Sequence, residues 1–155
     1  MTPASDTVLG VGVDLVDLSR IRTAFVRWGE KFCDRVFLDT EREYCDAQAS
    51  PHRHYAGRFA VKEAVAKAFG TGIGDPIGWH DIQIIRDTNT GAPSVKLLGR
   101  ARELARRRGV TRILVSLSHT HGQAVAQAVV LGIPSAPARK RRRTNSPNRQ
   151  RKSHD

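Results

Sequence analysis

The spacing of apolar residues changes along the chain, and each change predicts a different element. Residues 8–18 (VLGVGVDLVDL) are almost entirely apolar and alternate with a period of two, which is typical of a strand. Between residues 51 and 69 the apolar side chains recur at helical spacing on one half of a helical wheel, after a Ser-Pro pair that marks a helix start. The same periods predict helices at 19–28, 40–49 and 99–109, and strands at 82–86, 95–97, 113–117 and 123–131.

The strand at 8–18 has two unlike faces. Its odd positions are apolar, whereas Gly10, Gly12 and Asp14 form a face without side chains that ends in a carboxylate. Glycine weakens a strand, so this face predicts the close approach of another segment. A carboxylate in such a setting needs an arginine, a helix start or a metal ion as its partner. Asp17 is better suited to cap the next helix, which leaves Asp14 available for a site.

The other half of the helical wheel at 51–69 is charged. It contains Lys62, Glu63 and Lys67, and the last two are one turn apart in the order that favours a helix ion pair. From periodicity alone such a face is a solvated surface more often than a site. A second carboxylate at Asp14 changes this balance, because two acids beside a lysine are suited to bind a metal ion and a phosphate.

Two further segments carry candidate chemistry. Gly70 ends the central helix, and the amides of the glycine-rich loop at 70–74 are predicted to close on an anion. This loop follows a helix and lacks the Lys-Ser/Thr pair of a P-loop, so it matches neither phosphate-binding fingerprint. His119 ends a strand between Ser118 and Thr120, without a nucleophile elbow or zinc spacing, and taken alone it is typical of a structural histidine.

Helix 19–28 combines a buried stripe with basic residues. The stripe is predicted from Ile21, Ala24, Phe25 and Trp28. Arg20, Arg22 and Arg27 lie on the outside of the same helix, where arginines are commonly just solvated but can also dock an acidic partner.

Length and composition indicate one soluble domain with a tail. The chain has 155 residues, no apolar run long enough to span a membrane, and no signal-peptide pattern at its start. Its two cysteines have no metal spacing, which predicts reduced thiols and a cytoplasmic protein. Residues 134–155 hold eight of the 26 basic residues and one of the 15 acidic ones, so most of the net charge of +11 belongs to this segment. We therefore predict a domain at 1–133 and a disordered basic tail at 134–155, with nucleic-acid binding possible only through the tail.

The motifs taken together resemble the holo-acyl-carrier-protein synthase family of phosphopantetheinyl transferases. The resemblance covers about residues 8–131 and rests on these stretches, in order: Gly10–Asp14 (GVGVD), Arg58–Ile73 (RFAVKEAVAKAFGTGI), Asp81–Ile82, Gly91–Pro93 (GAP) and Ser116–Thr120 (SLSHT). It implies a compact α+β fold of antiparallel strands packed with helices. It also implies a homotrimer whose sites are shared between neighbouring chains.

The resemblance implies the Mg²⁺-dependent transfer of 4'-phosphopantetheine from coenzyme A to a serine of an apo acyl carrier protein. Asp14 and Glu63 then hold the metal ion, and Glu63 and Lys67 are catalytic. The residues implied in coenzyme binding are Arg58, Lys67, Gly70, Thr71, Gly72, Ser118, His119 and Thr120. The resemblance also implies that the three arginines of helix 19–28 bind the carrier, because acyl carrier proteins present an acidic helix.

Several alternatives remain at this stage. The serine proton is taken by a metal-bound water or by Glu63, with Glu41 a weaker candidate because the stretch at 37–40 departs from the commoner family pattern. The carrier is that of fatty-acid synthesis or one of a polyketide or peptide synthetase. Functions of other classes are nucleic-acid binding through the tail and metal-dependent phosphate hydrolysis.

Overall fold

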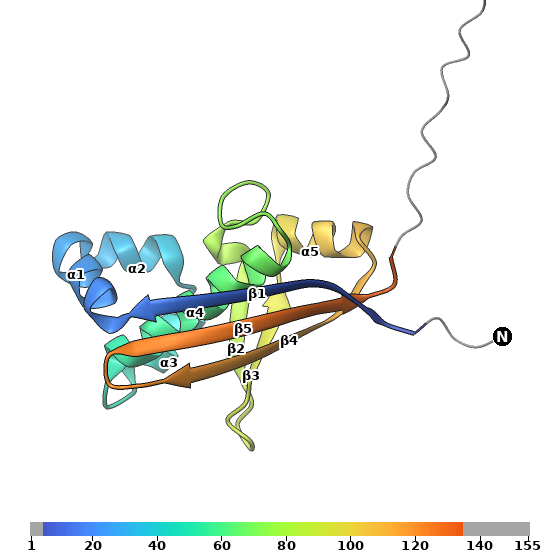
Figure 1. Ribbon diagram of the computed structural model, residues 1–155. Helices are drawn as coiled ribbons and strands as arrows, with labels where there is room; N and C mark the ends of the chain where they lie inside the picture. Colours follow the sequence, from blue (N-terminus) through green and yellow to red (C-terminus); the bar gives the residue numbers. More distant parts are fainter. Residues whose placement is uncertain (1–4, 135–155) are drawn as a thin grey trace, which may run out of the picture.

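The fold is organised around α4 (Pro51–Ala68), which lies behind a three-stranded antiparallel sheet in this computed structural model (Figure 1). The structure describes residues 5–134. The sheet has the order β1 (Thr7–Asp17), β5 (Gln123–Gly132), β4 (Val110–His119), and β2 (Ile82–Arg86) pairs with β3 (Pro93–Leu97) in a separate hairpin. The other elements are α1 (Leu18–Trp28), α2 (Glu30–Val36), α3 (Asp39–Asp46), the 3-10 turn η1 (Trp79–Asp81) and α5 (Gly99–Arg107). This arrangement confirms the predicted α+β class.

The alternation of β5 explains how the sheet covers α4. Its even positions are small, and Ala124, Ala126 and Ala128 are at most 1% exposed. Small side chains let the sheet approach the helix closely, which is why β1 and β5 can both pack on it. The register pairs Asp14 with Ala126, so the candidate carboxylate is on the face of the sheet that packs on α4.

α4 is buried on more than its apolar half. The predicted start at Ser50 is confirmed, as is the burial of the apolar half of the wheel. The charged half is not a solvated surface, however, because Lys62 is 0% and Arg58 is 5% exposed. The sheet, α1, α3 and β2 all pack against this helix, so only part of one side faces solvent.

The helices before α4 differ in detail from the prediction. α2 was not predicted, because seven residues after a glycine are too few to display a clear helical period. α3 begins at Asp39 instead of 40 and ends at Asp46 instead of 49, with Leu38 as its N-cap. Trp28 is 56% exposed, so it does not belong to the buried stripe of α1.

The face of the sheet that points away from α4 is exposed and apolar. Val11, Val13 and Leu15 on β1 are each more than half exposed, and Val125 and Leu114 extend the same face onto β5 and β4. No described helix covers the near side of this sheet in Figure 1. Large uncovered apolar patches usually mark an interface.

Among residues 5–134, no helix combines the length and the apolar character that a membrane crossing requires. The predicted basic tail lies outside the described residues, except for its first residue, Pro134.

Candidate active site

The glycine face of β1 lets the strand lie directly on α4. A methyl group at Gly12 would lie 1.9 Å from the carbonyl oxygen of Ala64, and one at Gly10 would lie 1.9 Å from that of Ala68. Side chains at either position would hold the strand away from the helix. The predicted close approach is therefore confirmed, and it brings Asp14 to the charged turn of α4.

Lys67 joins this turn to the strand. Its Nζ lies 2.8 Å from Asp14 Oδ1 and 3.1 Å from the carbonyl oxygen of Val13. The Lys67 side chain remains 48% exposed, so its amine can also meet a ligand. Burial raises the pKa of the nearby Glu63 carboxyl, the negative charge of Asp14 raises it further, and Lys67 opposes both. The structure thus brings together three predicted residues that lie far apart in the sequence.

The two carboxylates fit a magnesium ion. Asp14 and Glu63 are close enough for their charges to interact, and a divalent cation between them would relieve that repulsion. Mg²⁺ takes oxygen ligands and is usually held by only one or two protein carboxylates. Within residues 5–134, no cluster of three or more His, Cys, Asp or Glu side chains is placed to hold a metal ion, so the protein would supply just these two.

A second cluster surrounds Arg58. Its guanidinium carbon lies 3.9 Å from the centre of the Tyr44 ring, and His119 reaches the same place from the end of β4. The Arg58 Nε and the His119 Nε2 are buried and have no hydrogen-bond partner among residues 5–134. An unpaired buried polar group costs about 1–3 kcal/mol, so two such groups on residues that line one pocket point to a ligand. Because one of the groups is a guanidinium, the pocket is suited to an anion.

Sequence reasoning missed His54, which also lines this pocket. The ring centres of His54 and His119 are 6.2 Å apart. Burial lowers the pKa of both histidines, and nearby arginines lower it further. The available signal was the i,i+4 spacing of His54 and Arg58, which places both on one side of a helix. The cavity measures about 190 Å³ and is lined by Tyr44, His54, Arg58, Ile84, Arg86, Gly91, Pro93, Leu117 and His119.

The two clusters do not meet within one chain. The pocket around Arg58 and His119 includes none of Asp14, Glu63 and Lys67. A ligand that touches both clusters would therefore have to extend between pockets or bind where two chains meet.

The neighbours of His119 are used differently. Ser118 is exposed and alternates with His119 along β4, so it belongs to the outer face of the sheet. The hydroxyl of Thr120 accepts the N–H of Gln123 at 3.0 Å and thereby stabilises the turn between β4 and β5. Neither residue lines the pocket that contains His119.

Three backbone amides of the loop after α4 are bonded to the helix itself. Gly70 N–H donates to the carbonyl of Lys67, and the N–H groups of Thr71 and Gly72 both donate to Ala66. Gly70 and Gly72 have φ values of 74° and 63°, which only glycine adopts easily. These three amides cap the helix in this structure, and the predicted role of the loop toward an anion stays a prediction.

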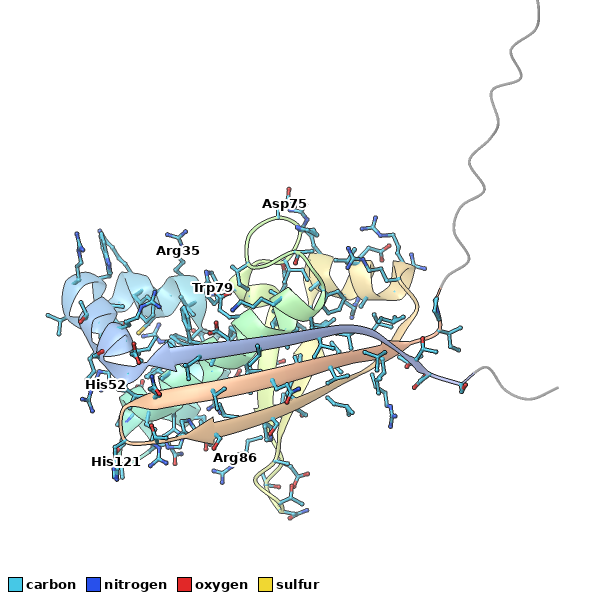
Figure 2. The ribbon with its side chains drawn as sticks, viewed as in Figure 1. Arg35, His52, Asp75, Trp79, Arg86 and His121 are labelled. Atoms are coloured by element: carbon cyan, nitrogen blue, oxygen red, sulfur yellow. The ribbon has the colours of Figure 1, made fainter. Side chains whose placement is uncertain are left out.

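The arginines of α1 lie on the surface, and residues of this helix line two hollows. Arg20, Arg22 and Arg27 are exposed, and none forms an ion pair within residues 5–134. Arg22 borders a polar hollow with His52 and His121, which Figure 2 shows at the same end of the sheet. The other hollow, here called the aromatic groove, measures about 490 Å³ and is lined by Trp28, Lys31, Phe32, Arg35, Val36, Phe59 and Trp79.

Glu41 lies away from these sites. It is 1% exposed, and its Oε2 lies 2.8 Å from the Nζ of Lys62, which is fully buried. Burial lowers the pKa of Lys62, and the charge of Glu41 opposes that effect. A carboxylate enclosed in this way cannot receive a proton from a bound substrate, so Glu41 is excluded as the general base.

Comparisons with known proteins agree with this arrangement. Residues 10–128 match the model of the 4'-phosphopantetheinyl transferase superfamily. The holo-[acyl-carrier-protein] synthase of Desulforudis audaxviator is 47% identical over 133 residues, which are 86% of this chain and 99% of the relative.

Solved structures give the same result. The Neisseria meningitidis synthase has a TM-score of 0.75 at 30% identity, covering 80% of this chain and 98% of the other. The Helicobacter pylori synthase, solved in complex with coenzyme A, has a TM-score of 0.69 at 32% identity, covering 77% and 98%. The shared motifs, the fold and these identities show that this chain belongs to the holo-[acyl-carrier-protein] synthase family of the 4'-phosphopantetheinyl transferase superfamily.

Proposed function

We propose that this protein transfers 4'-phosphopantetheine from coenzyme A to a serine of apo acyl carrier protein. The observation that carries this proposal is the meeting of Asp14, Glu63 and Lys67 at one place, together with a separate anion pocket at Arg58. The serine oxygen forms a new bond to phosphorus while the bond within the pyrophosphate breaks. The serine loses its proton, and adenosine 3',5'-bisphosphate leaves.

The residues at Asp14 take the reacting end of the coenzyme. Asp14 and Glu63 would hold Mg²⁺, which when bound polarises the phosphoryl group and offsets the charge that grows on it. Lys67 balances Asp14 and meets a phosphate oxygen as a point charge. Since Glu41 is enclosed, we infer that Glu63 would be the protein carboxylate that receives the serine proton.

The Arg58 pocket takes the phosphate of the nucleotide end. The unpaired Arg58 Nε and the ring of His119 are suited to a phosphate, and His54 adds a third nitrogen group. Arg86 borders the same pocket and is fixed by its 2.7 Å bond to the hydroxyl of Tyr44. The predicted roles of Gly70, Thr71, Gly72, Ser118 and Thr120 toward the coenzyme stay predictions.

Assembly into a homotrimer would complete the site. The exposed apolar face of β1, β5 and β4 needs a cover, and a second chain is the simplest one. Because the two clusters of one chain do not share a pocket, a coenzyme bound between chains could use Asp14 of one and Arg58 of its neighbour. The separation of the two clusters supports this arrangement.

The carrier protein would dock at α1 and the aromatic groove. Arg20, Arg22 and Arg27 are exposed cations for an acidic helix, and the groove offers aromatic walls between Lys31 and Arg35. Carrier binding therefore combines charge steering with a buried apolar contact. We also expect the reaction to take place in the cytoplasm, in keeping with two free, buried cysteines.

Mass spectrometry of an apo carrier incubated with coenzyme A, Mg²⁺ and this protein tests the function. We expect the carrier to gain one phosphopantetheine, and Asp14→Asn or Glu63→Gln to abolish the gain without loss of fold. Asp39→Asn, an exposed acid on α3, is the matched control. Full activity of Asp14→Asn or Glu63→Gln would remove the proposed metal site.

The same assay separates the alternatives. Polyketide and peptide-synthetase carriers, offered in place of the fatty-acid carrier, identify the preferred acceptor. Coenzyme cleavage without any carrier would indicate a phosphohydrolase. Deletion of residues 134–155 should leave transfer unchanged, whereas loss of function on deletion would favour the nucleic-acid reading of the tail.

A further inference from the structure

The most enclosed charges of the described chain form an ion pair outside the proposed site. Lys62 Nζ lies 2.8 Å from Glu41 Oε2, and both side chains are 0% exposed. The same Nζ donates to the carbonyl oxygen of Trp79 at 2.9 Å. Lys62 thus joins the middle of α4 to α3 and to η1.

Glu41 extends these connections. Its Oε1 accepts the N–H of Ile84 at 2.8 Å, and its Oε2 accepts the N–H of Leu38 at 2.9 Å. The carboxylate therefore links the start of α3 to β2 as well as to Lys62. Three stretches that are distant in sequence, 38–41, 62 and 79–84, share this one pair of charges.

Stability alone does not account for such a pair. Removing two charges from water costs several kcal/mol per ion, and apolar replacements of buried pairs are often neutral or stabilising by about 1–4 kcal/mol. What a fully bonded pair does provide is a single geometry, because each of its hydrogen bonds has a fixed length and direction.

The segments bonded to this pair form walls of the aromatic groove and of the Arg58 pocket. Trp79 packs on Phe59 with ring centres 4.9 Å apart, and both line the aromatic groove. Figure 2 shows Trp79 on the same side of the molecule as Arg35, another residue of this groove. Ile84 lies in the wall of the Arg58 pocket. Lys62 is next to Glu63 in α4, so both walls are tied to the helix that carries the proposed metal ligand.

We propose that the Glu41–Lys62 pair is a positioning device, which sets the Trp79 wall of the aromatic groove relative to the turn of α4 that carries Glu63. This inference rests on the proposed function, in which the groove receives the carrier protein. With the wall fixed, a docked carrier presents its serine at the reacting phosphate. With the wall free, carrier binding must also order the wall, so binding weakens and the carrier KM rises.

The test is the double variant E41Q/K62M, which removes both charges and keeps side chains of similar size. We expect the carrier KM to rise about ten-fold, because part of the binding free energy is then used to order the wall. The Kd of adenosine 3',5'-bisphosphate should change by less than the carrier KM. Glu43→Gln and Lys96→Met, exposed residues of the same types, are matched controls and should stay within about two-fold of the wild type.

Two further measurements keep the test decisive. Should the double variant fail to fold, Glu41→Asp keeps the charges but shortens the acid by one methylene, and the same rise in KM is expected. The chain has two tryptophans, so a Trp28→Phe background makes Trp79 the only emitter. There, acrylamide quenching of Trp79 should increase when the pair is removed, whether or not a carrier is present.

A folded pair variant with an unchanged carrier KM and unchanged Trp79 quenching would overturn the inference, even if its Tm had fallen. That result would leave the pair with a structural role only. Absence of transfer by the wild type would instead refute the proposed function, while Trp79 quenching would still report on the positioning of the wall.

Discussion

The contact between β1 and α4 offers the sharpest test of how this site is built. Replacing Gly12 with alanine adds one methyl group at the point of closest approach. That methyl would lie 1.9 Å from the Ala64 carbonyl oxygen and 2.6 Å from the Ala68 nitrogen, where an ordinary contact is 3.4 Å or more. Both obstacles are backbone atoms, so no side chain can rotate away.

The size of the effect follows from this geometry. Strand and helix must separate by roughly 1.5 Å, which is the difference between the 1.9 Å approach and an ordinary 3.4 Å contact. The interior is close-packed there, so neighbouring atoms must move as well. Overpacking of this kind costs about 1–3 kcal/mol, and we expect the upper end because the backbone itself must move. For a domain of this size, that lowers Tm by roughly 10 °C.

The same displacement of β1 should also lower the rate of transfer. Asp14 lies two residues further along β1, so displacement of the strand changes its distance from Glu63 on α4. A misplacement of about 1 Å can cost a hundred-fold in rate, so we expect kcat to fall by about that factor at a temperature where the variant is still folded. Calorimetry gives the change in Tm, and transfer to an apo carrier at saturating coenzyme gives kcat.

Gly122→Ala is the matched control, because a methyl group at Gly122 meets nothing within 4 Å. We expect its Tm and kcat to stay near those of the wild type. If Gly12→Ala and Gly122→Ala behave alike, the close packing of β1 on α4 does not position the site, and the reasoning fails.

Three other predictions concern the anion pocket, the outer sheet face and the buried pair. Burial holds the pKa of His54 and His119 below the usual histidine value, and a bound phosphate favours their protonated forms, so adenosine 3',5'-bisphosphate should bind several-fold more tightly at pH 6.5 than at pH 8. Calorimetric titration measures this affinity, and an unchanged pH dependence in the double variant His54→Gln with His119→Gln would contradict the prediction. Val13→Glu places a charge on the exposed apolar face, so light scattering should find a smaller assembly than for the wild type; an unchanged mass would argue against that interface. Lys62→Met leaves Glu41 buried without its cation and should lower the free energy of unfolding by about 3–5 kcal/mol, most of which E41Q/K62M should restore. Denaturant unfolding tests this, and equal stabilities of the two variants would refute it.

Much of this protein was determined by the sequence alone. The two-residue period of β1 and the helical period of α4 identified both elements, because such periods depend only on nearby residues. Gly10 and Gly12 predicted the close approach of another segment, also for a local reason, because only glycine leaves room for another backbone. The acids and the lysine of the site were found from their residue types and from the family motif.

The tertiary structure decided where each charge lies. The helical wheel put Lys62 on a charged face, yet α3, β2 and η1 cover it, and no local pattern reveals that. His54 lines a pocket because the end of β4 places His119 next to it, and these two residues are distant in the sequence. The amides after Gly70 turned back onto α4 instead of facing a ligand. Burial and pairing depend on segments far away in the chain, and those contacts exist only once the chain has folded.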